Sequence, residues 1–299
     1  MLYYRYCGFV IASSTKFPEL IEIKSNKGEP LTLIEEGEVP PSNHKKLCFG
    51  PNWAVGPDES YWWLNGIVRF RITPGKIIYQ AELNASESLI RALLLEAPMI
   101  LALQYAGAFC LAVSAVSDGS KVDALKFLAG GGASTAAAWQ VTRGKTRRLH
   151  SDTLLHVSLD DSGCPMAWPQ GSGVLLWPKS IELLNLKQQA MRAIRPELPV
   201  KRVKISSETG PLPLKTIYRA GFHSRLEESS QEDHNFLQGR RPFRLAALQT
   251  AGRLWVDPIG KTADHFSWCL SIARHCRIEK GTEQNLYSGK KDLLSPLKN

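Results

Sequence analysis

The pattern of apolar and polar positions divides the chain into a β-rich beginning and an alternating α/β remainder. Four short β-like runs, FVIASS, LTLIE, IVRFRI and KIIYQAEL, occupy the beginning and are separated by segments rich in Gly, Pro and Asn. This spacing predicts a small mixed sheet. We therefore expect a β-rich N-terminal region over residues 1–83.

A helical segment is expected next. Asn84 or Ser86 can cap it, and apolar residues recur from Leu89 to Leu95. A second helix should continue past Pro98. The uncharged run 97–117 has the length of a membrane-spanning helix, about 20 residues, but its last part alternates as a strand does. We therefore predict a core helix and a buried strand here, and no membrane span.

The order of elements from residue 111 is that of an α/β protein. Strand-like and helix-like segments alternate as LAVSAV, VDALKFLA, STAAAWQVT and SDTLLHVSL, with SDGSK and GGGA as turns. A strand GVLLWP, a helix over 180–194, a strand over 253–256 and a helix over 263–275 should follow. We expect an α/β domain with a parallel or mixed sheet over 84–288, and a flexible tail over 289–299.

Composition fits a globular protein with an anionic partner. The 299 residues are 43% hydrophobic and 22% charged, and the formal net charge is +9. A basic protein favours nucleotides, acidic peptides, nucleic acid or membrane phosphates as ligands. The basic clusters at 145–148, 201–204 and 240–244 lack the interleaved aromatic residues of nucleic-acid modules, so we do not expect nucleic acid as the partner.

The cysteines indicate a reduced, cytoplasmic protein. Six cysteines are scattered without a C-x-x-C pair, and the first residues lack a secretory signal. His265, Cys269, His275 and Cys276 share one expected helix and present a possible metal site. Cys269 and Cys276 also fit a helical core stripe, which is the interpretation we favour.

The most informative segment is the glycine turn Gly130, Gly131 and Gly132 between a strand and an alanine-rich helix. Such a turn brings backbone N–H groups and the positive end of the helix dipole to one point, where an anion can bind. A complete P-loop reads G-x-x-x-x-G-K-[ST]. Here Ala133 stands at the lysine position and Ser134 at the magnesium position, so the motif is partial and an ordinary flexible turn is the alternative.

In the succession of its motifs the chain resembles HPr-kinase-like proteins, including the related kinases of lasso-peptide precursors. The segments that carry the resemblance are LIRALLL (89–95), LAVSAV (111–116), DG (118–119), ALKFLA (124–129), GGGAST (130–135), AAAWQ (136–140), RG (143–144), LHSDT (149–153), VLLWP (174–178) and PLPLKTIY (211–218). The resemblance extends from about residue 66 to the C-terminal part. It implies an HPr-kinase-like P-loop domain that binds ATP or another nucleotide with magnesium.

The departures from the family pattern lie where the chemistry would occur. Ala112 replaces the family's histidine, Ala133 the P-loop lysine and Thr153 the second aspartate of the S-D-D element. What the resemblance still implies is a phosphate contact by the glycines, Ser134 and Thr135, and a magnesium contact by Ser134 and Asp152. Loss of a preorganised electrostatic donor lowers a rate on the order of a hundredfold to a thousandfold.

Three functions stay open. The first is a pseudokinase-like protein that binds a nucleotide, a phosphate group or a peptide in a peptide-modification pathway of natural-product biosynthesis. The second is an active phosphotransferase acting on a peptide or small molecule, in which a displaced cation replaces the lysine; the candidates are Lys121, Lys126, Arg143 and Lys145. The third is a different enzyme that uses His150 and Asp152 as an acid–base pair on one strand face. The oligomeric state stays open in all three.

Overall fold

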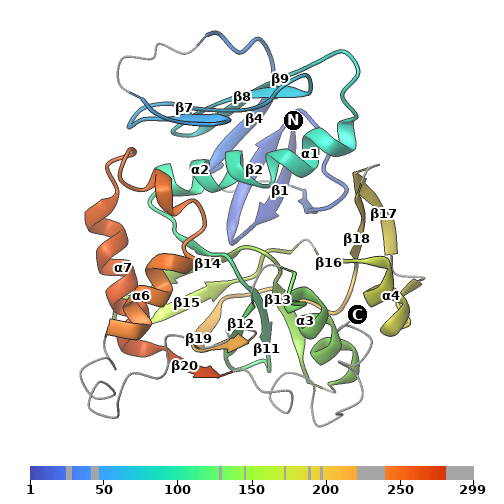
Figure 1. The fold of residues 1–299 in the computed structure, drawn as a ribbon, viewed down its shortest axis with the longest axis vertical. Coiled ribbons are helices and arrows are strands. Elements are labelled where there is room, and N and C mark those ends of the chain that lie inside the picture. The colour runs from blue at the N-terminus through green and yellow to red at the C-terminus, as the bar shows by residue number, and fades with distance from the viewer. Residues whose placement is uncertain are drawn as a thin grey trace.

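The protein has a mixed α/β fold, in which three sheets are packed with a small number of helices (Figure 1). The computed structural model describes residues 1–24, 29–41, 47–127, 130–144, 146–171, 173–187, 190–195, 198–220 and 240–280. The predicted flexible tail over 289–299 lies outside the described residues.

The N-terminal region forms a nine-stranded sheet with the order β3-β1-β2-β4-β9-β8-β7-β6-β5. Its strands are β1 (Leu2–Tyr6), β2 (Phe9–Ser13), β3 (Ile21–Ile23), β4 (Thr32–Glu36), β5 (Cys48–Gly50), β6 (Trp53–Val55), β7 (Ser60–Leu64), β8 (Val68–Thr73) and β9 (Lys76–Ala81). In β8 the buried side chains Val68, Phe70 and Ile72 alternate with more exposed ones, as the pleat requires. Because β4 pairs in parallel with β2 and β9, the predicted mixed sheet is confirmed.

Two short helices cover one face of this sheet. They are α1 (Glu87–Leu94), capped by Ser86, whose Oγ accepts a hydrogen bond from the Leu89 N–H, and α2 (Ala97–Tyr105). By length and composition the stretch Glu87–Tyr105 could cross a membrane, but 67% of its most apolar window is buried inside the protein. Both helices share one hydrophobic core with the N-terminal sheet. Their apolar character is therefore that of core helices, and the core continues across the predicted boundary at residue 83.

The second sheet has eight strands and carries the candidate site. Its strands are β10 (Cys110–Leu111), β11 (Ser114–Ser117), β12 (Val122–Phe127), β13 (Arg148–Ser151), β14 (Leu155–Leu159), β15 (Pro165–Trp168), β19 (Leu212–Ala220) and β20 (Arg277–Lys280). β12, β19 and β20 are parallel neighbours, whereas the other pairs are antiparallel. The alternating α/β order thus produces a mixed sheet, as expected.

Helices pack on both faces of this second sheet. The helix α3 (Ala133–Arg143) contacts β11, β12 and β13, and its alanines share a core with Leu125 and Phe127. On the other face Val122 and Ala124 pack with α6 (Arg240–Gln249) and α7 (Thr262–His275). The side-chain alternation along β12 therefore separates two cores, one on each face of the sheet.

The third sheet has the order β16-β18-β17 and corrects two sequence predictions. It contains β16 (Val174–Leu176), β17 (Ala190–Arg195) and β18 (Leu198–Val203), beside α4 (Pro178–Leu183). The helix expected over 180–194 is wrong beyond Leu183, because Asn185 takes a left-handed φ of 56° and the chain then enters β17. The strand expected over 253–256 is also wrong, since Arg253–Trp255 is a 3₁₀ helix, η3, that follows a left-handed Gly252.

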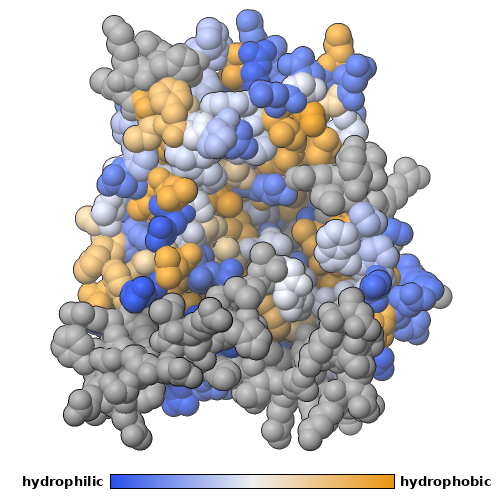
Figure 2. All heavy atoms as spheres, viewed as in Figure 1, coloured by the Kyte–Doolittle hydropathy of each residue, from blue (hydrophilic) through white to orange (hydrophobic). Residues whose placement is uncertain are grey.

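Apolar side chains reach the surface over the C-terminal helices. Figure 2 shows apolar atoms along the left side of the view, where α6, η3 and α7 lie. Leu248, Leu254 and Phe266 are 56%, 67% and 56% exposed, respectively. The predicted helix over 263–275 is confirmed as α7, and Cys269 and Cys276 belong to its buried core.

Candidate phosphate-binding site

The glycine turn lies where β12 ends and α3 begins. Gly130 and Gly132 have φ values of 76° and 90°, which favour glycine, and Gly132 is the N-cap of α3. Ala136, Ala137 and Ala138 are fully buried, so the helix packs closely onto β11 and β12. This packing fixes the first turn of α3, with its unpaired backbone N–H groups, at the end of β12.

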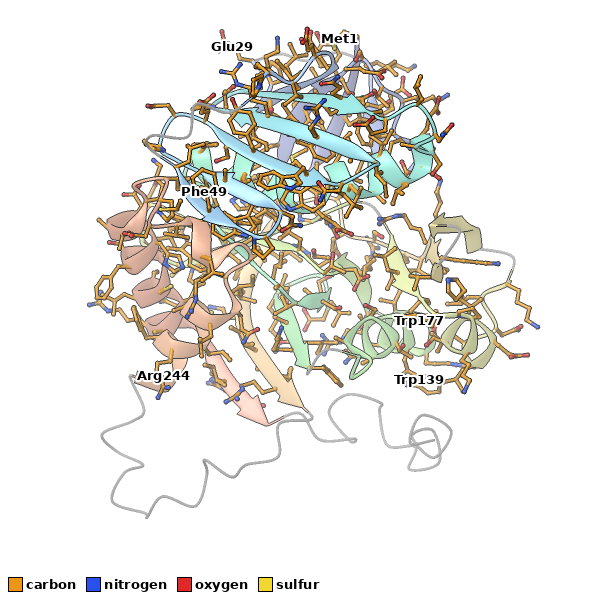
Figure 3. The ribbon with its side chains drawn as sticks, turned by 45° about the horizontal axis from the view of Figure 1, so that its top comes forward. Met1, Glu29, Phe49, Trp139, Trp177 and Arg244 are labelled. Atoms are coloured by element: carbon orange, nitrogen blue, oxygen red, sulfur yellow. The ribbon has the colours of Figure 1, made fainter. Side chains whose placement is uncertain are left out.

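A cavity of about 630 Å³ opens at this turn. It is lined by the three glycines and the start of α3, by residues from the ends of β11 and β12, and by the segment that leads into α4. Trp177, which is 53% exposed, lies at the start of α4, and Figure 3 shows it on the same side of the molecule as Trp139 of α3. A cavity of this volume accommodates a nucleotide-sized ligand.

Asp152 is held beside the cavity by several hydrogen bonds. Its side chain is buried, and the residue is 2% exposed. Ser114 Oγ donates to Oδ1 at 2.7 Å, and the Leu175 N–H donates to Oδ2 at 2.8 Å. Ser134, in the first turn of α3, lies close enough to Asp152 that its hydroxyl lowers the pKa of this carboxyl. The two predicted magnesium ligands, Ser134 and Asp152, are therefore brought together.

The electrostatics of Asp152 are those of a buried carboxylate in a polar pocket. Burial raises the pKa of Asp152 above its usual value, because the charged form is desolvated. Hydrogen bonds from the Leu175 N–H, Ser114 and Ser134, and the positive charge of Arg202, offset part of this rise. A cation that binds to this carboxylate would stabilise its charged form further.

Asp152 lies in a bend and not on a strand. β13 ends at Ser151, and Thr153, which also lines the cavity, has a left-handed φ of 67°. The Asp152 carboxylate accepts hydrogen bonds from Ser114 and Leu175, whereas His150 bonds to Ala167. The placement of His150 and Asp152 on one strand face is therefore wrong.

His150 is buried apart from Asp152. Its Nε2 lies 2.9 Å from the carbonyl oxygen of Ala167, which accepts the hydrogen bond, and its Nδ1 is buried without a partner among the described residues. Burial lowers the pKa of His150, so the ring favours its neutral form. His150 does not line the cavity. Its catalytic role stays a prediction that this geometry does not favour.

Thr135 and Lys126 take different positions at the cavity wall. The Thr135 Oγ1 lies 2.9 Å from the Ser180 Oγ, so this hydroxyl connects α3 to α4. Lys126 Nζ donates a hydrogen bond to the Ala112 carbonyl oxygen at 3.1 Å. Both residues line the cavity, and Lys126 is only half buried.

The other displaced cations lie away from the glycine turn. Lys121 is exposed at the opposite end of β12, and Arg143 ends α3, where its guanidinium lies 5.2 Å from the Trp139 ring centroid. Lys145 lies outside the described residues. Within the described part of the chain, Lys126 is thus the one of these four that reaches the cavity.

Several residues that support Asp152 were not predicted. Ser114, Gln170 and the backbone of Leu175 all bond to Asp152, Gln170 through its Oε1 to the Asp152 N–H. Ser114 carries the only visible signal, a hydroxyl within an apolar strand. Among the described residues no group of three or more His, Cys, Asp or Glu side chains could hold a metal ion, and Cys269 and Cys276 lie in the buried core.

No protein-family model matches the chain, and no curated protein sequence matches it. The geometry of the cavity and the motifs that line it are therefore the basis for inferring a function.

Proposed function

We propose that the protein binds the phosphates of a nucleotide, together with magnesium, in the cavity at the start of α3, on an HPr-kinase-like P-loop scaffold. The observation that carries this proposal is the proximity of Ser134, which lines the cavity, to the buried Asp152 beside the glycine turn. A strand, a glycine turn, a helix N-terminus and the Ser134 hydroxyl meet at one cavity, and the buried Asp152 carboxylate is bonded to Ser114 and Leu175 in the cavity wall. Each of these groups serves phosphate or magnesium binding in P-loop proteins.

The residues present fit a magnesium ion. Magnesium prefers oxygen ligands and keeps several waters, so one or two protein groups together with substrate phosphates are sufficient. The Ser134 hydroxyl and the Asp152 carboxylate supply two oxygen-bearing groups. The ion would neutralise phosphate charge, while the backbone N–H groups of α3 would face the remaining phosphate oxygens.

The same site lacks groups that phosphoryl transfer uses. Ala112, Ala133 and Thr153 have no side-chain base, cation or second carboxylate. We therefore favour a pseudokinase-like role in which nucleotide binding regulates contact with a peptide or protein partner, in a peptide-modification pathway. A phosphotransferase with rearranged residues is the second candidate, because Lys126 lines the cavity.

Calorimetric titration of ADP and ATP, with and without magnesium, tests the proposal. We expect micromolar binding that needs magnesium and weakens tenfold or more in Asp152→Asn, since a charged magnesium ligand is lost. Asp161→Asn is the matched control, because Asp161 is exposed and does not line the cavity. Binding that is absent, or equal in both variants, would contradict nucleotide binding at this cavity.

Release of phosphate from ATP separates the two candidates. The pseudokinase-like role predicts no turnover above background in the presence of magnesium. Robust turnover that disappears in Ser134→Ala or Asp152→Asn would instead establish the phosphotransferase.

A further inference from the structure

The cavity needs a cation that its glycine turn does not provide. Ionised Asp152 would add one negative charge, which the positive charge of Arg202 partly offsets, and a nucleotide would bring several more negative charges. P-loop proteins balance these charges with a lysine that follows the glycines. Here Ala133 occupies that position, in the first turn of α3. Two lysines line the cavity, Lys126 and Lys179, and only Lys126 is partly buried.

Lys126 approaches the cavity from the strand. Leu125 and Phe127 pack toward α3, so the alternation of β12 directs Lys126 to the other face of the sheet. From there its Nζ bonds to the carbonyl of Ala112, just before β11, at the cavity wall. An ammonium group has three N–H donors, and this bond uses one of them.

Nothing in the described part of the chain neutralises Lys126. It forms no ion pair with a carboxylate among the described residues, although other lysines such as Lys76 and Lys261 do. A half-buried ammonium without a counter-ion is costly, because its charge is partly desolvated. Burial accordingly lowers the pKa of Lys126. An anionic ligand in the cavity would relieve this cost.

We propose that Lys126 binds the terminal phosphate of the nucleotide, and so replaces from β12 the lysine that is missing at position 133. This assignment rests on the proposed nucleotide binding and names the residue that supplies its positive charge. The ligand class is a nucleoside diphosphate or triphosphate. Ala112 contributes by its carbonyl, which holds the ammonium at the wall, and by its small side chain, which leaves room beside it.

The test moves the lysine from one position to the other. In Lys126→Met the affinity for ADP with magnesium should fall roughly tenfold to a hundredfold, as expected for a charge-assisted hydrogen bond. Adding Ala133→Lys to Lys126→Met should restore most of this loss. Lys121→Met is the matched control, because it removes the same charge from the exposed end of the same strand.

A proton measurement distinguishes a charged contact from a structural effect. A bound phosphate should raise the pKa of Lys126, so at alkaline pH the wild-type protein should take up protons on binding. Titration at about pH 9 in buffers of different ionisation enthalpy measures this uptake. Lys126→Met should lose it, whereas Lys121→Met should keep it.

The outcomes separate the two proposals. If the wild-type protein binds ADP and Lys126→Met binds it equally tightly, the assignment of Lys126 is wrong and nucleotide binding stands. If Lys126→Met weakens binding but Ala133→Lys does not restore it and proton uptake is unchanged, Lys126 has only a structural role. If the wild-type protein binds no nucleotide, both proposals fail.

Discussion

The N-terminal sheet and the cavity differ in how their buried polar groups and left-handed residues are arranged. In the N-terminal sheet Phe70 is fully buried between the rings of Trp62 and Tyr79, and the Tyr79 hydroxyl is paired with Thr15. At the cavity, Asp152 is a buried carboxylate and Thr153 has a left-handed backbone. Such features also occur in the N-terminal region, at the left-handed Cys7 and the buried Thr32 hydroxyl, but there they lie apart. At the cavity they fall on adjacent residues, which is typical of a functional site. The first region should therefore determine stability and the second ligand binding.

The largest effect on stability is expected when a buried side chain of the N-terminal sheet is shortened. Phe70→Ala should lower the free energy of unfolding by about 3–5 kcal/mol, because it removes a fully buried ring and leaves a cavity. Urea denaturation measures this loss. The affinity of the folded fraction for ADP with magnesium should stay within about twofold of wild type. A large loss of affinity in the folded protein would mean that the two regions are coupled.

The second effect concerns a contact between the N-terminal sheet and the second sheet, which carries the cavity. His156 of β14 contacts Phe9 of the N-terminal sheet, and its Nδ1 lies 2.8 Å from the Cys7 carbonyl oxygen, which accepts the hydrogen bond. Burial lowers the pKa of His156 to about 4. A depressed histidine pKa gives stability that is complete above the unfolded value near 6.5 and is lost as the pH falls toward 4.

Unfolding at several pH values tests this contact. The wild-type protein should lose about 3 kcal/mol of stability from this group between about pH 6.5 and pH 4. His150 should add to the loss, since burial lowers its pKa as well. In His156→Asn the pH dependence over this interval should be smaller, although the variant starts less stable. An unchanged slope would show that His156 charges readily in the folded protein.

The third effect is a pH dependence of stability with the opposite sign, because the group concerned is a buried carboxylate and not a buried histidine. Burial raises the pKa of Asp152, so its ionisation destabilises the fold as the pH rises through that pKa. The free energy of unfolding of Asp152→Asn, relative to wild type, should therefore rise as the pH increases from acid to neutral, while the variant weakens magnesium-dependent binding. The gain should disappear at low pH, where wild-type Asp152 is protonated.

Asp123→Asn is the control for this gain. Asp123 is also a buried carboxylate, but it is paired with Arg147 at 2.8 Å, whereas Asp152 is bonded to Ser114 and Leu175 in the cavity wall. Its replacement should lower stability, since it leaves Arg147 without its partner. A loss of stability in both variants would mean that Asp152 also serves mainly as a structural group.

The sequence predicted the local features of the site better than its three-dimensional connections. The glycine turn, the start of α3 and the cap at Ser86 follow from local rules, because glycine conformation and helix capping depend on near neighbours. The contact of Ser134 with Asp152 was implied only through the family resemblance. The hydrogen bonds from Ser114 and Leu175 join segments far apart in the chain, which no local pattern reveals.

Two of the three wrong predictions have a common physical cause. The helix over 180–194 and the strand through Asp152 both failed where a residue other than glycine adopts a left-handed conformation, at Asn185 and at Thr153. Asparagine tolerates this conformation, but threonine rarely adopts it. At Thr153 the surrounding structure therefore overrides the local preference, which is itself a sign of a functional bend.

The smallest expected change in stability comes from relieving the backbone strain at this bend. Thr153 has a φ of 67°, which is unfavourable for a β-branched residue by roughly 1–2 kcal/mol, whereas asparagine tolerates it. Thr153→Asn should therefore raise the free energy of unfolding by about 1 kcal/mol, measured in urea. Asn185→Thr provides the reverse control, because Asn185 is exposed and has a φ of 56°. It should lower stability by a similar amount.

The two variants together decide whether strain or side-chain contact governs position 153. If Asn185→Thr lowers stability but Thr153→Asn does not raise it, contacts of the Thr153 side chain compensate for its backbone conformation. If both shifts appear, the bend retains strain that the protein has not removed, although a single substitution relieves it. The affinity of Thr153→Asn for ADP with magnesium then completes the comparison, since a strained bend retained for ligand binding should lose affinity when the strain is relieved, and one that is incidental should not.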